Sequence, residues 1–321
     1  MTFHVLIPDS VHPSALEVFQ STPEIRVSAS GQLQRAETMA AIADADALII
    51  RSATKADAEL LAAGSKLRAI ARAGVGVDNV DLKTATANGV VVMNTPEGNT
   101  IATAEETFAL MLALARHVPQ AYLSMREGKW DRKSYMGTEL RGKTLGIVGF
   151  GRIGRAVAKR ALAFEMSVIA YDPYIPEDIA ADLGVDLVSL DEIYRQSDYI
   201  TLHTVLTDET RSMIRRENID KMKSGVRIIN AARGALINEA DLAEAIKNGK
   251  VAGAALDVYA QEPPPADHPL IGLPGVVHTP HLAASTQEAQ IAVAVEAAQL
   301  IVDGLLNGKW RNVVNPEVLG A

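Results

Sequence analysis

The feature that most constrains the fold is a glycine-rich segment between an apolar run and a helical pattern. Residues 145–154 read LGIVGFGRIG. The apolar run 144–148 predicts a buried strand. After the glycines, Ile153, Val157 and Ala161 recur at helical spacing, which predicts a helix. A strand, glycines and a helix in this order are typical of the unit that binds the pyrophosphate of a dinucleotide.

Each glycine of the motif has a physical reason. Gly149 would permit the tight turn, and Gly151 would let the backbone approach a pyrophosphate. Gly154 would let the helix pack closely on its strand. The N-terminus of the helix offers free N–H groups and the positive end of its dipole to the phosphates.

An acidic residue after the next apolar run bears on which dinucleotide binds. The run 167–171 ends at Asp172, about 20 residues beyond the glycines, where a carboxylate accepts hydrogen bonds from the adenosine ribose. A carboxylate there repels a 2′-phosphate, and Pro173 and Tyr174 bring no basic side chain. The predicted cofactor is therefore NAD rather than NADP.

Length and composition restrict the function classes. A chain of 321 residues is long for one core and comfortable for two domains. Its net charge of −8 argues against a nucleic-acid partner. We count no apolar stretch of the ~20 residues that span a bilayer, and residues 1–9 lack the order of a signal peptide. The absence of cysteine excludes disulfides and thiolate metal sites. We expect a cytoplasmic protein without a metal.

Strand-like runs alternate with helical segments from end to end, the pattern of α/β folds with parallel sheets. Before the glycine motif these runs are 3–7, 25–28, 47–50, 67–71 and 90–93. From the motif onward they are 144–148, 168–171, 199–203, 226–230, 253–257 and 276–278. The two sets predict two doubly wound parallel-sheet domains.

Two long helical segments are expected to connect these domains. Residues 101–118 are apolar nearly all round, so both domains or another subunit would have to cover this helix. Residues 285–307 form a second helical segment that could return the chain to the first domain. The first domain would then comprise residues 1–97 and 286–321, with a nucleotide-binding domain at 98–285 and a cleft between them.

Three side chains that follow consecutive strands are candidate catalytic residues. They are Arg233, Glu262 and His281. Ligands of open α/β sheets bind beyond the carboxyl ends of the strands, so these groups are predicted to meet at one rim. A histidine can take the proton of a secondary alcohol while hydride leaves. A carboxylate would stabilise the imidazolium, and a guanidinium would hold the carboxylate of a 2-hydroxy acid. The residues therefore suit hydride transfer.

Other histidines have simpler interpretations. His278 and His281 have the spacing of helical metal ligands, but Pro280 between them argues against a helix, so a metal site is not expected. His203, at another strand end, is predicted to be a packing residue.

At this point the sequence resembles the D-isomer-specific 2-hydroxyacid dehydrogenase family over nearly its whole length. The resemblance rests on RSAT at 51–54, RAGVGVDN at 72–79, NTPEGN at 94–99, GKWDRK at 128–133 and MGTEL at 136–140, besides the glycine motif and the strand-end sites. The stretches around Arg51, Arg72 and Trp130 are similar to the phosphoglycerate dehydrogenase branch of that family. The resemblance implies a Rossmann-type nucleotide-binding domain and a flavodoxin-like substrate domain.

The resemblance also implies a role for each motif. Arg233, Glu262 and His281 would be catalytic, with His281 the proton acceptor and Glu262 its partner. The NAD site would be lined by Gly149, Gly151, Arg152, Ile153, Gly154, Asp172, Thr204, Ala231, Ala232, Asp257 and Ala284. The substrate would be held by Arg51, Ser52, Arg72, Gly74, Gly76 and Arg132. Arg132 would extend toward the neighbouring subunit of a homodimer built around the 101–118 helix.

The implied activity is NAD-dependent oxidation of 3-phosphoglycerate, a small anionic 2-hydroxy acid, to 3-phosphohydroxypyruvate, the first step of serine biosynthesis. Two alternatives stay open. One is a reductase of an unphosphorylated 2-keto acid such as hydroxypyruvate or glyoxylate. The other is an NAD-sensing binding protein, because transcriptional corepressors use the same scaffold, and fold alone does not fix function. Longer relatives continue into regulatory domains, and the sequence leaves open whether this chain is a natural short form or a truncated one.

Overall fold

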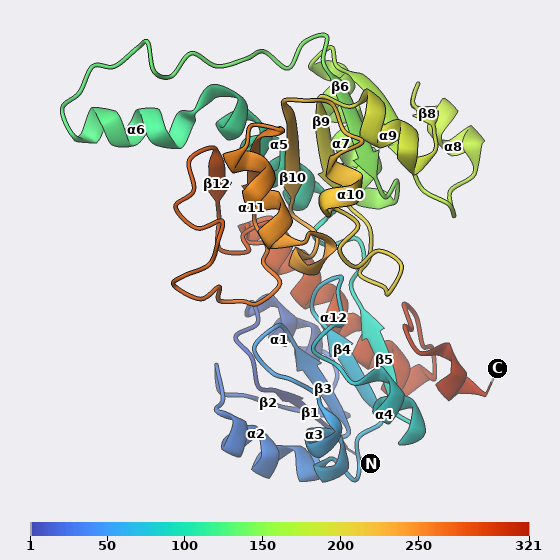
Figure 1. The fold of residues 1–321 in the computed structure, drawn as a ribbon. Helices are drawn as coiled ribbons and strands as arrows, with labels where there is room; N and C mark the ends of the chain where they lie inside the picture. The colour runs from blue at the N-terminus through green and yellow to red at the C-terminus, as the bar shows by residue number, and fades with distance from the viewer. Residues whose placement is uncertain (1, 321) are drawn as a thin grey trace. The chain divides into compact units, whose positions relative to one another are not determined.

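The computed structural model describes residues 2–320 and divides into two compact units. Unit 1 comprises Met1–Asn99 and Ser285–Ala321, and unit 2 comprises Thr100–Ala284. In Figure 1, unit 1 is blue to cyan with a red C-terminal portion, and unit 2 runs from green to orange. Each unit is a parallel sheet with helices, which confirms the predicted fold class.

Unit 1 contains a five-stranded parallel sheet in the order β2-β1-β3-β4-β5. The strands are β1 (Phe3–Ile7), β2 (Ile25–Ala29), β3 (Ala47–Ile50), β4 (Ala69–Arg72) and β5 (Val91–Asn94). The helices are α1 (Ser14–Gln20), α2 (Arg35–Ala41), α3 (Ala58–Ala63), α4 (Leu82–Ala87) and α12 (Gln287–Asn307), with short 3-10 turns at Ile42–Asp44 and Pro316–Leu319.

Alternation along the strands divides the core of unit 1 between the two faces of its sheet. In β1, Val5 and Ile7 join the cluster that includes α12, whereas Leu6 joins the cluster under α3. Polar residues interrupt α12, but by length and composition alone it is long and apolar enough to cross a membrane. Half of the apolar part of this helix is buried, however, and Ala294, Ala297 and other apolar residues of α12 pack in the core of unit 1.

Unit 2 contains a seven-stranded parallel sheet in the order β12-β11-β10-β9-β6-β7-β8. The strands are β6 (Thr144–Val148), β7 (Ser167–Tyr171), β8 (Asp186–Leu187), β9 (Tyr199–Leu202), β10 (Val226–Asn230), β11 (Val251–Leu256) and β12 (Val276–His278). The helices are α5 (Thr100–Arg116), α6 (Val118–Arg126), α7 (Arg152–Ala163), α8 (Glu177–Ala181), α9 (Leu190–Gln196), α10 (Arg216–Ile219) and α11 (Glu239–Lys247), with a 3-10 turn at Gly234–Leu236.

Helices cover both faces of the unit 2 sheet. Leu145 and Ile147 of β6 face the cluster that contains α5 and α7, and Val148 faces the cluster that contains α9 and α11. Residues of α5 such as Phe108 and Met111 lie in this core. Unit 2 therefore already covers most of the apolar surface for which we expected two domains or another subunit.

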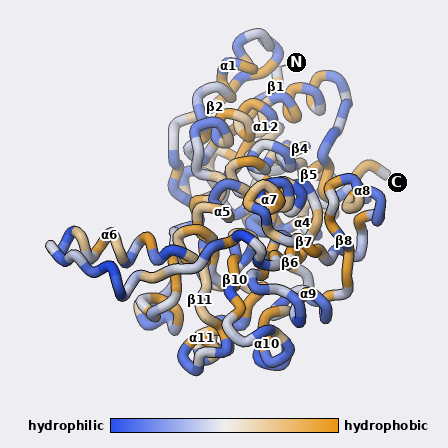
Figure 2. The backbone as a smooth tube through the Cα atoms, turned by 90° about the horizontal axis from the view of Figure 1, so that it is seen from above, coloured by the Kyte–Doolittle hydropathy of each residue, from blue (hydrophilic) through white to orange (hydrophobic). Residues whose placement is uncertain are grey.

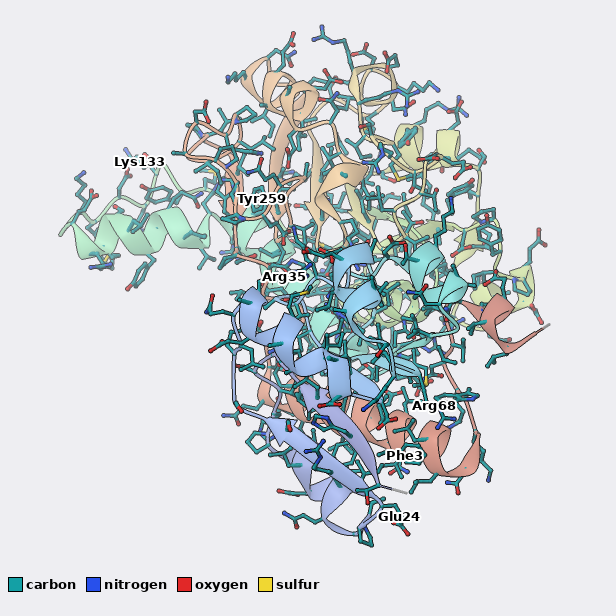
Figure 3. All side chains as sticks on the ribbon, turned by 90° about the horizontal axis from the view of Figure 1, so that it is seen from below. Phe3, Glu24, Arg35, Arg68, Lys133 and Tyr259 are labelled. Atoms are coloured by element: carbon teal, nitrogen blue, oxygen red, sulfur yellow. The ribbon has the colours of Figure 1, made fainter. Side chains whose placement is uncertain are left out.

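Beyond α5, the chain extends away from the sheet of unit 2 as α6 and the segment 127–137, which we call the arm (Figures 1 and 2). Lys133, labelled in Figure 3, lies on this segment. Large apolar side chains are exposed along the arm: Val118, Tyr122, Leu123, Met125, Trp130 and Met136.

Candidate active site

The glycine turn between β6 and α7 has the geometry that the motif predicts. Gly149 has a φ of 92°, and a Cβ on it would lie 2.6 Å from the carbonyl of His203. A Cβ on Gly154 would collide with the carbonyl oxygen of Gly149. At Gly151, in contrast, a Cβ would meet no protein atom within 4 Å. The turn is closed on the protein side and open at the N-terminus of α7, which is the space a pyrophosphate requires.

The residues around this turn fit a dinucleotide. Arg152 and Ile153 form the first turn of α7, and the backbone of Thr204 borders Gly149. Asp172 follows β7; its Oδ2 accepts the N–H of Phe150 at 2.8 Å, and its Oδ1 accepts the N–H of Tyr174 at 2.9 Å. The carboxylate is thereby fixed beside the glycine turn, and each oxygen keeps a further lone pair for a ribose hydroxyl.

A buried asparagine shapes the turn that carries Arg233. The Oδ1 of Asn230 accepts the N–H of Ala232 at 3.0 Å, and its Nδ2 donates to the carbonyl of Arg233 at 2.9 Å. Arg233 also donates from Nη1 to the carbonyl of Ala232 at 2.6 Å. Asn230 is fully buried, so it fixes the residues Ala231 to Arg233 at the end of β10.

His281 and Glu262 form a direct pair. The Nδ1 of His281 lies 2.7 Å from the Oε2 of Glu262. The N–H of Tyr259 donates to the other oxygen, Oε1, at 3.1 Å. Burial opposes ionisation of Glu262, but the hydrogen bonds from His281 and Tyr259 and the charges of His281 and Arg233 bring its pKa below the usual value. Since Nδ1 faces the carboxylate, Nε2 is the nitrogen left for a substrate proton.

The loop that carries His281 is held by Asp257, whose side chain is fully buried. Its Oδ1 accepts the hydroxyl of Thr279 at 2.6 Å and the N–H of Leu282 at 2.7 Å. Its Oδ2 accepts the N–H of Ala283 at 2.8 Å, and its carbonyl accepts the N–H of His281 at 2.8 Å. His281 itself has a positive φ of 56°, so its backbone conformation depends on these contacts. Ala284 follows directly after this loop.

Asp257 also acts on a neighbouring carboxyl. Burial and then the charge of Asp257 raise the pKa of Glu106, on α5, above its usual value. The sequence predicted Asp257 only as a residue of the NAD site, which stays a prediction; the structure adds its contacts to the His281 loop.

In unit 1, the loop after β3 that contains Arg51 and Ser52 is held from two sides. The Oδ2 of Asp9 accepts the N–H of Arg51 at 2.6 Å, and Asp9 also accepts the hydroxyl of Thr54. From the other side, Asn79 donates from Nδ2 to the carbonyls of Arg51 and Thr54 at 2.6 and 2.7 Å. We did not assign a role to Asp9 or Asn79 from the sequence. Asp9 carries only the signal of a polar residue after a predicted strand, whereas Asn79 ends the motif at 72–79 without a role of its own.

Arg72 ends β4, the strand that neighbours β3, with Ile50 opposite it in the register. A side chain on Gly74 would collide with the guanidinium of Arg72, so the glycine makes room for the arginine. Gly76 lies in the same loop. Arg51 and Arg72 therefore extend from the same edge of the unit 1 sheet.

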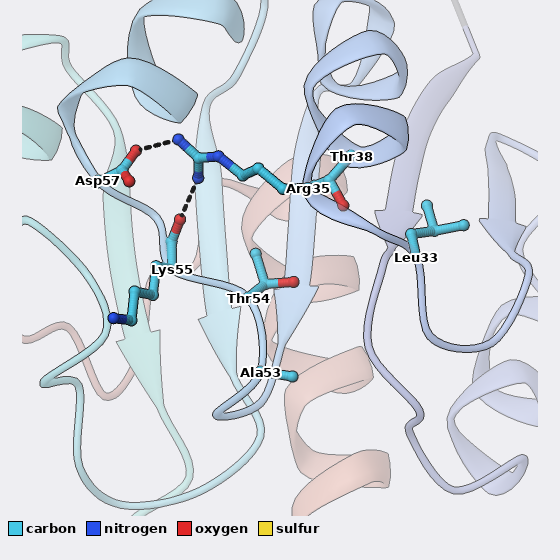
Figure 4. Close-up of a pocket in the computed structure, with 7 residues that line it drawn as sticks. All are labelled: Leu33, Arg35, Thr38, Ala53, Thr54, Lys55 and Asp57. Atoms are coloured by element: carbon cyan, nitrogen blue, oxygen red, sulfur yellow. Dashed lines mark hydrogen bonds and ion pairs between the residues drawn. The ribbon is translucent and has the colours of Figure 1, made fainter. Parts of the chain in front are cut away.

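A pocket of about 290 Å³ lies beside the loop after β3, the loop that contains Arg51 and Ser52 (Figure 4). It is lined by Leu33, Arg35, Thr38, Ala53, Thr54, Lys55 and Asp57. Arg35 donates to the carbonyl of Lys55 at 2.9 Å and to Asp57 at 2.7 Å, so its charge is already matched. None of the predicted substrate residues lines this pocket, and we assign it no ligand.

The structure thus brings Arg233, Glu262 and His281 together within unit 2. Arg132 belongs to the exposed arm of unit 2, and its role in substrate binding and its extension toward a neighbouring subunit stay predictions. Within residues 2–320, no group of three or more His, Asp or Glu side chains is arranged to hold a metal ion.

Comparison with known proteins gives a family. Residues 108–283 match the model of the D-isomer specific 2-hydroxyacid dehydrogenase NAD-binding domain. The D-3-phosphoglycerate dehydrogenase of Archaeoglobus fulgidus is 49% identical over 97% of this chain, and this chain spans 59% of its length. Other curated relatives are spanned to a similar extent.

Solved structures have the same fold. The TT0316 protein of Thermus thermophilus matches with a TM-score of 0.88 and 37% identity, covering 97% of this chain and 100% of that chain. A glyoxylate reductase from Paecilomyes thermophila matches with a TM-score of 0.88 and 30% identity, covering 98% of this chain and 99% of that chain.

Proposed function

Since the chain belongs to the D-isomer-specific 2-hydroxyacid dehydrogenase family and carries its NAD-binding domain, we propose that it oxidises 3-phosphoglycerate to 3-phosphohydroxypyruvate, the first step of serine biosynthesis. The observation that carries the reaction type is the 2.7 Å pair of His281 and Glu262 at the carboxyl edge of the nucleotide-binding sheet. The substrate is supported by the 49% identity to a D-3-phosphoglycerate dehydrogenase over 97% of this chain.

The proposed mechanism assigns one task to each catalytic residue. NAD, when bound, supplies the hydride acceptor. His281 takes the hydroxyl proton at Nε2, and Glu262 stabilises the imidazolium through Nδ1. Arg233 holds the substrate carboxylate and polarises the developing carbonyl. The carboxylate of Asp172 would accept hydrogen bonds from the ribose hydroxyls of NAD, and its negative charge would disfavour a 2′-phosphate.

A second candidate, reduction of glyoxylate or hydroxypyruvate, is favoured by the structural likeness to a glyoxylate reductase. An NADH absorbance assay separates the two. We expect the highest kcat/KM with 3-phosphoglycerate and NAD, weak turnover of D-glycerate, and a large loss with NADP. Faster turnover of glyoxylate or hydroxypyruvate would establish the second candidate, and no turnover of any 2-hydroxy or 2-keto acid would leave a binding protein.

We further propose that the protein is a cytoplasmic homodimer. Its contact was predicted around residues 101–118, where Ile101 is 55% exposed. The exposed apolar residues of the adjoining arm support an extension of that surface. Analytical ultracentrifugation tests the dimer: a monomer at micromolar concentration would contradict it.

A further inference from the structure

Beneath the loop that carries Glu262 lies a set of polar groups to which the proposed mechanism gives no role. It consists of Glu239, Tyr259, His268 and His278, which we call the His–Glu cluster. Glu239 begins α11, and Tyr259 is labelled in Figure 3. The side chains of His268 and Glu239 are only 6% and 17% exposed. Buried polar groups are costly unless they are paired, so their partners show what they stabilise.

Glu239 bridges the loop and the buried histidine. Its Oε1 accepts the N–H of Ala260 at 2.9 Å, and its Oε2 lies 3.0 Å from the Nε2 of His268. The Nδ1 of His268 accepts the N–H of Leu270 at 3.3 Å. Among the described residues the Nε2 of His268 has no hydrogen-bond partner, so it faces the Glu239 carboxylate as a close polar contact and not as a hydrogen bond. Glu239 thus joins the loop, through a hydrogen bond, to the buried imidazole, through a close contact.

Tyr259 holds the loop from its other side. Its ring contacts His268 edge-on, with centroids 5.4 Å apart, and its hydroxyl lies 2.8 Å from the Nδ1 of His278. Burial and neighbouring carboxylates raise the pKa of Tyr259 to about 12, whereas burial and His268 lower the pKa of His278. The phenol and the imidazole that share this hydrogen bond are therefore both neutral at pH 7.

These contacts lead directly to the catalytic groups. The N–H of Tyr259 donates to Glu262, which pairs with His281. A Cβ on Gly234, the residue after Arg233, would collide with the carbonyl of Tyr259, so the same loop also packs against the turn that presents the arginine. A displacement of Ala260 would move Tyr259 and Glu262 together.

We propose that Glu239, paired with His268, is a positioning residue that holds Glu262 against His281. The kinetic part of this inference rests on the proposed function. Glu239 reaches the catalytic pair only through the loop, by the N–H of Ala260, so it tunes the proton transfer without contacting substrate.

The variant Glu239→Gln tests the proposal. An amide is uncharged and has one accepting oxygen, so the variant loses either the hydrogen bond from the N–H of Ala260 or the contact of the carboxylate with His268. We expect kcat to fall by roughly 10-fold, which corresponds to about 1.4 kcal/mol of lost transition-state stabilisation, with KM for NAD unchanged. The acidic limb of the pH–rate profile should move to lower pH, as in Glu262→Gln, and the double variant should add little.

The control is Glu244→Gln, on the same helix α11. Glu244 is exposed and pairs with Arg216, so this change removes a carboxylate from α11 without touching the loop. We expect wild-type kcat and pH profile. A second pair of variants distinguishes loss of the contact from misfolding. His268→Gln keeps a polar N–H group opposite Glu239 and should retain most activity, whereas His268→Leu should behave like Glu239→Gln.

A measurement without turnover separates the inference from the proposed function. The sample is the ligand-free protein with ¹⁵N-labelled histidine. The proton on Nδ1 of His281, hydrogen-bonded to Glu262, should give a downfield NMR signal. Loss of this signal in His281→Gln assigns it. We expect Glu239→Gln to broaden or remove it and Glu244→Gln to leave it. An unchanged signal and pH profile in Glu239→Gln would overturn the positioning role. A wild-type protein with this signal but no dehydrogenase activity would instead overturn the proposed function.

Discussion

The pair of His281 and Glu262 determines how the proposed reaction should respond to pH and to substitution. His281→Ala removes the proton acceptor, so kcat should fall roughly 10²–10⁴-fold. Glu262→Gln removes the charge beside the imidazolium, 2.7 Å away. The neutral imidazole then persists to lower pH, so the acidic limb of the oxidation should move downward in pH. Steady-state kinetics between pH 5 and 10 measure both effects, and a wild-type rate for His281→Ala would refute the assignment.

Asp257 is a second residue whose contacts lead to a measurable expectation. The two oxygens of Asp257 accept hydrogen bonds from Thr279, Leu282 and Ala283. In Asp257→Asn one oxygen becomes an NH2 group, so at least one of these donors loses its acceptor. We expect kcat to fall about 10-fold while the Kd for NAD, measured by fluorescence, changes little. A weaker Kd with an unchanged kcat would instead favour the NAD contact predicted from the sequence.

At the residue scale, the sequence predicted that three side chains in loops after consecutive strands meet. Arg233, Glu262 and His281 do lie together, because the carboxyl ends of parallel strands share one edge, and their catalytic role stays a prediction. The residues that hold the loops could not be found in this way. Asp9 and Arg51 are 42 positions apart, and Glu239 and Ala260 are 21 apart, so only the folded chain reveals that they meet.

At the scale of elements, the glycine turn allows stability and cofactor binding to be tested separately. Gly151→Ala adds a methyl group where no protein atom lies within 4 Å, so the free protein should keep its Tm while NAD binding weakens. Gly149→Ala forces an L-residue to a φ of 92° against the carbonyl of His203. It should destabilise the protein by roughly 1–3 kcal/mol. Calorimetry and NAD titration of both variants check this, and an equal loss of Tm would contradict it.

Elements with strong apolar runs were predictable, and those with weak ones were not. The strand 144–148 was expected and is observed as Thr144–Val148, because its residues are buried on both faces of the sheet. The edge strand β8 has only two residues, Asp186–Leu187, too few for any periodic signal. The sequence predicted that α5 is apolar nearly all round. It did not specify that the residues packing against this helix come mainly from unit 2 itself.

For the molecule as a whole, His203 should contribute to acid sensitivity. Burial lowers its pKa to about 3, whereas an unfolded histidine titrates near 6.5. Between these values the unfolded chain binds a proton that the folded chain does not, so stability falls as pH decreases, by up to about 1.4 kcal/mol per pH unit. His203→Gln should therefore lose less Tm than the wild type between pH 7.5 and 5. Parallel pH dependences in thermal melts would count against this prediction.

The substrate assignment also concerns the whole molecule, because it joins the arginines of unit 1 to a reaction proposed for unit 2. Arg51 and Arg72 extend from one edge of the unit 1 sheet, where ligands of such sheets bind. Arg233 already serves the substrate carboxylate in the proposed mechanism, so further guanidinium groups suit a phosphate, which offers more charge and more acceptor oxygens.

Arg51→Ala should therefore raise KM for 3-phosphoglycerate while changing the weak turnover of D-glycerate little, the kinetic signature of a lost phosphate contact. Arg51 is the better test because Arg72 also packs on Gly74, so its removal would disturb the loop itself. The matched control is Arg68→Ala, which removes an arginine at the opposite end of β4, where it lies 5.3 Å from the ring centroid of Phe3 (Figure 3). If Arg51→Ala weakened both substrates equally, or if the wild type preferred glycerate, the phosphate assignment would fail and the reductase of unphosphorylated 2-keto acids would take its place.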